Sequence, residues 1–240
     1  MHGAQMSWTS QEVTDLIYNS KILKKPLPQS AVEALMKKGT VKAYEKGALI
    51  LQRGEQKTRF FVLLKGTARL SAHTLSGREF VSIFVEPGNF WGVHACLDDV
   101  QESHDALAET EVEVLALPAK ALRDLMWENR DIQEALVAFL CQRFRMALDV
   151  AEQFATWKPR ARLAWRLLYL AQSHGIVANG RRGLEVAVSQ EALASMINLS
   201  RQRTNILLKE MEREGLVRLE YGRIGVRDAD AMQALLDNPT

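Results

Sequence analysis

The chain has 240 residues, of which 47% are hydrophobic and 25% are charged. This balance is typical of a globular protein and excludes a disordered or collagen-like chain. No apolar run approaches the roughly 18 residues that a membrane-spanning helix needs, and the first residues show no secretory signal. Two cysteines are too few for a disulfide framework or an iron–sulfur cluster. We therefore expect a cytoplasmic protein of one or two domains with no membrane partner.

Basic residues gather in the C-terminal third of the chain. The formal net charge is +2 overall, but residues 157–206 carry 8 Lys and Arg against 2 Asp and Glu. A local excess of this kind is typical of a polyanion-binding surface. A solvated basic face would give the same count, so charge alone leaves both interpretations open.

The N-terminal half predicts helices followed by many short strands. Residues 12–38 have a helical pattern broken at Pro26 and Pro28. From residue 40 to 117, short runs rich in Val, Ile, Phe and Leu recur at roughly 8–12-residue spacing, with glycines between them. This pattern of short apolar runs separated by glycines predicts a β-sandwich, roll or barrel.

Helical spacing returns after Pro118. A short helix is expected to Met126, and a longer one from Asn129 or Asp131 to Trp157. The apolar residues of the longer helix form a narrow stripe, which is typical of a helix that pairs with another helix. We predict a dimerisation seam at seven positions of this stripe, one of them polar: Ile132, Leu136, Phe139, Arg143, Met146, Val150 and Phe154. A core helix of the same domain is the alternative. Lys158-Pro159 then marks a break before a new helix, and residues 179–183 have the composition of a polar hairpin-like loop.

Residues 189–216 predict two short helices joined by a four-residue turn. Ser189 and Ser200 can cap the two helices. Asn198 tolerates the left-handed backbone of a tight turn, and Gly215 can end the second helix. This is the helix-turn-helix pattern. An ordinary helical hairpin is the alternative.

The outward face of the second helix carries side chains suited to DNA. Arg, Gln and Asn can pair with base edges, Lys can reach a phosphate, and Ile can contact a thymine methyl group. The candidate contacts on this helix are Ser200, Arg201, Gln202, Arg203, Asn205, Ile206 and Lys209. Downstream, the segments LVRLE and RIGVR predict a two-stranded wing. Its candidate contacts to the DNA backbone are Arg218, Arg223 and Arg227.

Over essentially residues 20–236, the chain resembles the Crp/Fnr family of bacterial transcription regulators. The resemblance rests on EKGALILQRGE, FFVLLKGTARL and EPGNFWG, on the long helix from Asn129, and on LSRQRTNILLKEMEREGLV. It implies an α+β fold with a cyclic-nucleotide-binding-like β-roll, a dimerisation helix and a winged helix-turn-helix. We place these parts at residues 1–128, 129–157 and 158–240, respectively.

The resemblance also implies partners and contacts. A homodimer would bind a pseudo-palindromic operator in double-stranded DNA, and RNA polymerase is a further expected partner. Ser189 and Gln190 would touch phosphates, while Arg201 and Gln202 would read bases. Relatives that resemble the catabolite activator carry Glu where this chain has Gln202, so adenine becomes the favoured contact.

The effector region departs from the family pattern. The candidate pocket residues are Gly92, Val93, His94, His104, Asp105, Ala147 and Leu148. Cyclic-AMP binders place Glu-Leu after the PGxFxG turn, where this chain has Val93-His94. They place Arg-Ser on the cyclic phosphate, where this chain has the segment 103–106, and Asp105 would repel that phosphate. Their Thr-Ser pair on the long helix aligns with Ala147-Leu148. We expect no binding of cyclic AMP in the usual mode.

No cofactor follows from the sequence. His73, His94, His104 and Cys96 are candidate ligands for haem or a metal, because gas-sensing relatives exist in the family. Their spacing matches no metal motif, so neither group is expected. A small neutral or cationic ligand, a cyclic dinucleotide bound elsewhere, or no ligand are the alternatives for the effector. Two other interpretations of the chain are a roll that regulates a protein partner and a haem-containing gas sensor. No nucleophile–base set or phosphate-cradling glycine loop indicates an enzyme.

Overall fold

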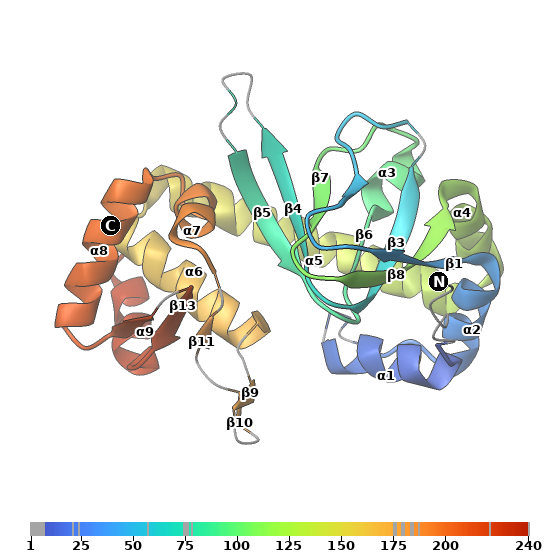
Figure 1. Cartoon of the computed structure of the whole chain (residues 1–240). Helices are drawn as coiled ribbons and strands as arrows, with labels where there is room; N and C mark the ends of the chain where they lie inside the picture. The colour runs from blue at the N-terminus through green and yellow to red at the C-terminus, as the bar shows by residue number, and fades with distance from the viewer. Residues whose placement is uncertain are drawn as a thin grey trace. The chain divides into compact units, whose positions relative to one another are not determined.

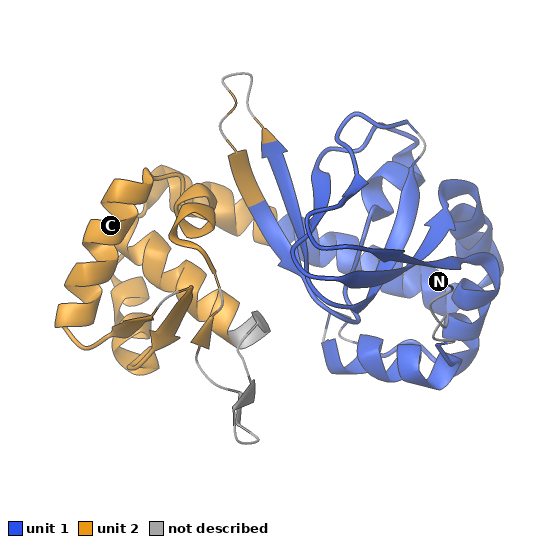
Figure 2. Ribbon diagram, in the orientation of Figure 1, with its two compact units in different colours: residues 1–72, 82–145 blue, residues 73–81, 146–240 orange. Residues whose placement is uncertain are grey.

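The computed structural model describes residues 8–20, 22–23, 25–56, 58–73, 77, 79–174, 177–178, 181–182, 185–186, 188–220 and 222–239. The chain divides into two compact units (Figure 2). Unit 1 consists of residues 1–72 and 82–145, and unit 2 consists of residues 73–81 and 146–240.

Among the described residues, the N-terminal part of the chain contains four short helices and eight strands (Figure 1). The helices are α1 Ser10–Ser20, α2 Gln29–Lys38, α3 Val93–Asp98 and α4 Ala119–Glu128. The strands are β1 Thr40–Tyr44, β2 Leu49–Leu51, β3 Arg59–Lys65, β4 Ala68–His73, β5 Glu79–Val85, β6 Phe90–Trp91, β7 Asp105–Ala108 and β8 Val112–Pro118.

These strands form the predicted roll from two four-stranded antiparallel sheets. The strand orders are β1-β8-β3-β6 and β2-β7-β4-β5. Strand β3 shows how the roll is stabilised, because its side chains alternate between two cores. Phe60, Val62 and Leu64 pack with the helices, whereas Phe61 and Leu63 pack in a second cluster with side chains of the other sheet. Strands β1, β6 and β7 were not predicted, since none of them has a long apolar run.

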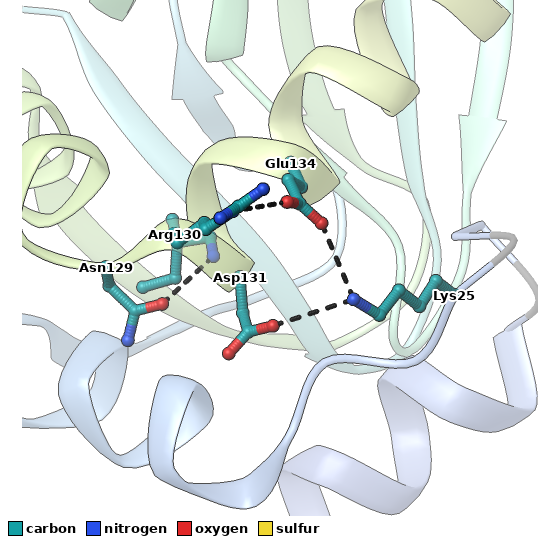
Figure 3. Close-up of polar contacts among 6 residues, drawn as sticks. Lys25, Asn129, Arg130, Asp131 and Glu134 are labelled. Carbon is teal, nitrogen blue, oxygen red and sulfur yellow. Dashed lines mark hydrogen bonds and ion pairs between the residues drawn. The ribbon is translucent and has the colours of Figure 1, made fainter.

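The long helix α5, Arg130–Thr156, begins at a network of polar contacts (Figure 3). The side-chain oxygen of Asn129 accepts a hydrogen bond from the backbone N–H of Ile132 at 3.1 Å, as a helix cap should. Arg130 Nε donates to Glu134 at 2.8 Å, and Lys25 Nζ lies 3.5 Å from Glu134 and 3.8 Å from Asp131. The predicted start of the long helix near Asn129 is therefore confirmed.

The first turns of α5 correct the predicted dimerisation seam. Ile132, Leu136 and Phe139 are buried in the helix-covered core of unit 1. Phe139 also packs against Phe90, with ring centroids 4.4 Å apart. Three of the seven predicted seam residues are thus part of the chain's own core, as the alternative of a core helix expects. Arg143, Met146, Val150 and Phe154 are half-buried, and their place in a dimer interface stays a prediction.

The C-terminal part of the chain contains a helical group and a small sheet. Its helices are α6 Pro159–His174, α7 Gln190–Met196, α8 Arg201–Arg213 and α9 Ala229–Asp237. Its strands are β9 Val177–Ala178, β10 Arg181–Arg182, β11 Glu185–Val186, β12 Val217–Glu220 and β13 Arg223–Val226. Strands β9 and β10 pair, and β11, β13 and β12 form a sheet in that order. In the predicted loop at 179–183, Asn179, Gly180 and Gly183 lie outside the described residues.

Candidate nucleic-acid interface

Helices α7 and α8 have the predicted helix-turn-helix arrangement, with a side-chain cap at each start. Ser189 Oγ accepts a hydrogen bond from the backbone N–H of Ala192 at 3.1 Å. Ser200 Oγ accepts one from the backbone N–H of Arg203 at 3.2 Å. Asn198, in the turn between the helices, has φ of 54°, the left-handed conformation that its residue type tolerates.

One face of α8 is buried, and this sets the orientation of the helix. Leu207, Leu208 and Met211 are buried against the rest of unit 2. Thr204 is also buried, and its hydroxyl donates to the backbone carbonyl of Ser200 at 3.0 Å, so its polar atom is satisfied. Because this face is held inward, the opposite face of α8 is presented to solvent.

That opposite face is the recognition face, which consists of Arg201, Gln202, Arg203, Asn205, Ile206 and Lys209. Asn205 is half-buried and the other five are exposed. Ile206 is 40% exposed, so its aliphatic side chain is accessible to a partner. No ion pair joins Arg201, Arg203 or Lys209 to another residue that the structure describes. Their charges are therefore available to an anionic partner.

Ser189 and Gln190 lie at the start of α7. Ser189 is exposed and Gln190 is half-buried. The phosphate contacts that the family resemblance implies for these two residues stay a prediction.

The predicted wing is formed by β12 and β13, with β11 added at its edge. Glu212 Oε1 on α8 accepts the backbone N–H of Leu219 at 2.8 Å, which fixes the wing to the recognition helix. Arg218 forms an ion pair with Glu220, and Arg223 lies 4.0 Å from Glu185. Two of the three predicted wing contacts thus already have a carboxylate neighbour, a pairing that the sequence did not reveal.

An ion pair between α6 and the residue after α8 fixes the C-terminal end of α8. Arg160, in the first turn of α6, donates from both Nη atoms to the Glu214 carboxylate; the Nη1–Oε1 distance is 2.8 Å. The Arg160 guanidinium lowers the pKa of Glu214 by hydrogen bonding. Glu214 and Arg160 are 54 positions apart in the sequence, so no local pattern could have predicted this pair.

The candidate effector residues fall in both units. Gly92, with φ of 82°, precedes α3, and a Cβ there would come within 2.1 Å of the carbonyl oxygen of Arg59. Val93 is buried, whereas His94 is exposed. Asp105 accepts the backbone N–H of Arg53 at 2.8 Å. All of these residues belong to unit 1.

Ala147 and Leu148 belong to the part of α5 in unit 2, and both are exposed. The assignment of these two residues to an effector pocket stays a prediction.

A small apolar cavity lies within unit 1. Its lining residues are Ile17, Leu23, Leu27, Leu35, Phe60, Val62, Phe90, Leu122, Ile132, Ala135 and Leu136. No polar side chain is present there to orient a nucleotide, because every lining residue is apolar. The cavity is therefore part of the core and not a nucleotide site.

An exposed apolar stripe runs along α5 on a different face from the predicted seam. Val137, Phe144 and Leu148 are 51%, 66% and 54% exposed, respectively. Cys141 is also exposed, as are Ala151 and Ala155. We call these six positions the outer seam. Their spacing alternates between four and three residues, which is the heptad pattern of paired helices.

The described part of the chain shows neither a membrane span nor a metal cluster. No helix there is long and apolar enough to cross a bilayer. No group of three or more His, Cys, Asp and Glu side chains is placed to hold a metal ion, again among the described residues.

Comparison with known proteins gives two family matches. A model described as "Cyclic nucleotide-binding domain" matches residues 41–129, and one described as "Crp-like helix-turn-helix domain" matches residues 161–235. A "CRP-like cAMP-activated global transcriptional regulator" from Mycobacterium tuberculosis is 26% identical over 204 residues, which cover 85% of this chain and 91% of that protein.

Solved structures show the same architecture. A transcriptional regulator of the CRP family from Thermus thermophilus is 25% identical with a TM-score of 0.68, covering 82% of this chain and 97% of that one. FixK2 from Bradyrhizobium japonicum is 18% identical with a TM-score of 0.72, covering 82% of this chain and 96% of that one. The latter likeness supports the fold alone.

Proposed function

The chain belongs to the Crp/Fnr family of DNA-binding transcription regulators, and from that premise we propose that it binds a pseudo-palindromic operator in double-stranded DNA as a homodimer. The observation that supports this most directly is the recognition face of α8. It presents exposed Arg201, Gln202 and Lys209 on a helix that is capped at Ser200 and buried along its other side.

In this proposal α8 enters the major groove. Arg201 and Gln202 contact base edges, because their side chains can each make two hydrogen bonds to a single base. Ile206 packs against a thymine methyl group, which buries its exposed aliphatic side chain. Lys209, Ser189 and Gln190 contact phosphates and fix the position of the helix along the duplex.

We infer that the outer seam joins the two chains. A twofold dimer is needed to present two α8 helices about 34 Å apart, one turn of DNA. Val137, Phe144 and Leu148 expose large apolar surfaces that parallel pairing of two α5 helices would bury. Ala151 and Ala155 are small, so the two helices could approach closely at the C-terminal end of the seam. The register of this pairing would set the spacing of the two recognition helices.

We further propose that cyclic AMP does not bind this chain in the usual mode of the family, because the residues that would hold it are absent. Val93 has no acceptor for a ribose hydroxyl, and Asp105 places a carboxylate where a phosphate would need a cation. Leu148 belongs to the outer seam and has no hydrogen-bonding group. A contact with RNA polymerase stays a prediction.

The test begins with selection of bound sequences from random DNA, using the full chain. On the selected operator, Arg201→Ala and Gln202→Ala should each weaken binding by about 1–3 kcal/mol, the cost of one lost bidentate contact. Arg213→Ala, which removes an exposed charge from the last turn of the same helix, serves as the control and should change affinity less. Unchanged operator affinity in both recognition variants, with the fold intact, would instead favour a roll that regulates a protein partner.

A further inference from the structure

Two histidines that are ten positions apart in the sequence converge on one hydroxyl at the surface of unit 1. His94 Nε2 lies 3.0 Å from Ser103 Oγ, and His104 Nδ1 lies 2.8 Å from the same oxygen. A hydroxyl has one proton, so it can donate to only one of the two rings at a time. Rotation of this one side chain leaves two ring nitrogens directed toward a common point.

One ring lies in a helix and the other directly before a strand. His94 is in the first turn of α3, which packs against α4 and β3. His104 directly precedes β7, and β7 is hydrogen-bonded between β2 and β4. Because the two backbones are fixed, the rings are already near each other before any ligand arrives. His94 and Ser103 are exposed and His104 is half-buried, so an ion could enter from solvent.

Charges of both signs surround the pair. Asp98 lies one helical turn after His94 and its carboxylate acts on that ring. At His104, the charge of Arg53 acts more strongly than the opposite charge of Asp105. A neutral imidazole ring has one nitrogen lone pair, which it can share with a cation.

From this geometry we propose that His94 and His104 are the protein ligands of a divalent transition-metal ion of the Zn²⁺, Ni²⁺ and Cu²⁺ group. Imidazole nitrogens suit these ions, whereas Mg²⁺ and Ca²⁺ prefer oxygen ligands. Zinc–nitrogen bonds are about 2.0–2.1 Å long, so each ring must approach the shared point by roughly 0.7–1.0 Å, which side-chain rotation can supply.

The proposed site has two protein ligands, and water completes its coordination. No third His, Cys, Asp or Glu is placed with this pair among the residues that the structure describes. Such a site binds an exchangeable ion and not a structural one, because structural zinc sites use four protein ligands. The proposal does not depend on DNA binding. It differs from the expectation, drawn from residue spacing, that the chain binds no metal.

Titration of the metal-free full chain with ZnCl₂, followed by calorimetry, tests the proposal. His2→Ala and His174→Ala are introduced together as a background, so that these two histidines cannot contribute. In this background one ion should bind per chain. Adding His94→Ala or His104→Ala should lower the affinity at least about tenfold, since loss of even an outer-shell partner of a metal ligand costs 10–100-fold.

Two controls separate ligand loss from other effects. His73→Ala removes an exposed histidine at the end of β4, and Ser103→Ala removes the bridging hydroxyl while keeping both rings; both variants should bind like the background protein. Circular dichroism without metal checks that each variant is folded, and His94→Gln replaces His94→Ala should the latter not fold. Nickel-induced broadening of the ring-proton NMR signals should affect His94 and His104 and spare His73. Equal affinity in the background protein and in either ligand variant, or broadening that misses these two rings, would overturn the proposal.

Discussion

Ser200 Oγ accepts the backbone N–H of Arg203 at 3.2 Å, and this single hydrogen bond caps the helix that carries the recognition face. Ser200→Ala should weaken the first turn of α8 by about 1 kcal/mol, the usual cost of losing a serine cap. Hydrogen exchange of the α8 backbone amides should therefore become roughly fivefold faster, given that 1.4 kcal/mol corresponds to a factor of ten.

Ser189→Ala is the matched control for this prediction, because Ser189 caps α7 with the same geometry. It should speed exchange in α7 and leave α8 unchanged. Ser200→Asp should retain slow exchange in α8, since aspartate also caps helices well. Equal exchange in α8 for Ser200→Ala and the unmodified chain would contradict a capping role.

The helix-turn-helix could be predicted from sequence because its signals are local. The caps at Ser189 and Ser200 and the left-handed Asn198 depend on a few neighbouring residues, and the structure confirms all three. The effector and DNA contacts assigned to individual residues stay predictions. The Arg160–Glu214 pair could not be foreseen, because only the tertiary fold brings these residues together.

The long helix α5 shows that a periodic pattern can match more than one face of a helix. Helix α5 has two apolar stripes, and both satisfy helical spacing. Ile132 and Leu136 pack into unit 1, whereas Phe144 is 66% exposed. Periodicity alone does not indicate which stripe the rest of the chain covers. The same limit applies to His94 and His104, because only the tertiary fold brings α3 close to residues 103 and 104.

A charge at the centre of the outer seam should separate the dimer. Phe144→Glu would place two carboxylates opposite each other in an apolar interface, which is strongly unfavourable. We expect a dimer for the unmodified chain and a monomer for the variant, measured by sedimentation or light scattering. Gln142→Glu introduces the same charge on another face of the helix and should leave the dimer intact. A Phe144→Glu protein that remains dimeric would exclude the outer seam as the dimer interface.

Cys141 offers an independent measurement of the same interface. In paired α5 helices it would face its counterpart across the twofold axis, within the range of about 4.4–6.8 Å between Cα atoms that a disulfide allows. Mild oxidation should therefore yield a covalent dimer on a non-reducing gel, and Cys141→Ser should abolish it. Cys96→Ser should have no effect, because Cys96 is buried in unit 1 and burial raises the pKa of its thiol to about 12.

Cyclic AMP should not bind in the roll. Val93 is 1% exposed and apolar, and the Asp105 carboxylate would repel the cyclic phosphate. Calorimetry of the full chain with cyclic AMP should give no saturable heat, and the unfolding temperature should not shift, since a ligand stabilises only the state that it binds. Micromolar binding that disappears in Gly92→Val would contradict this expectation. The extra side chain at Gly92 cannot fit beside the Arg59 carbonyl, so such a loss would locate the ligand near this turn.

The buried carboxyl group of Glu102 should make unit 1 less stable as pH rises. Glu102 is 4% exposed, and its Oε1 has no hydrogen-bond partner among the described residues. Burial, with a smaller contribution from Glu55, raises its pKa from 4.5 to about 7. The folded chain therefore holds a proton that the unfolded chain releases between these two pH values. Stability should fall through that window, by at most about 3 kcal/mol, and then level off.

Glu102→Gln should remove this dependence, because the amide keeps the shape of the protonated carboxyl group and does not ionise. Thermal unfolding between pH 4 and 8, with EDTA present so that metal ions do not contribute, should show the variant gaining stability over the unmodified chain as pH rises. Glu111→Gln, at an exposed position, should follow the unmodified chain. Parallel curves for Glu102→Gln and the unmodified chain would mean that Glu102 has an ordinary pKa in the folded protein.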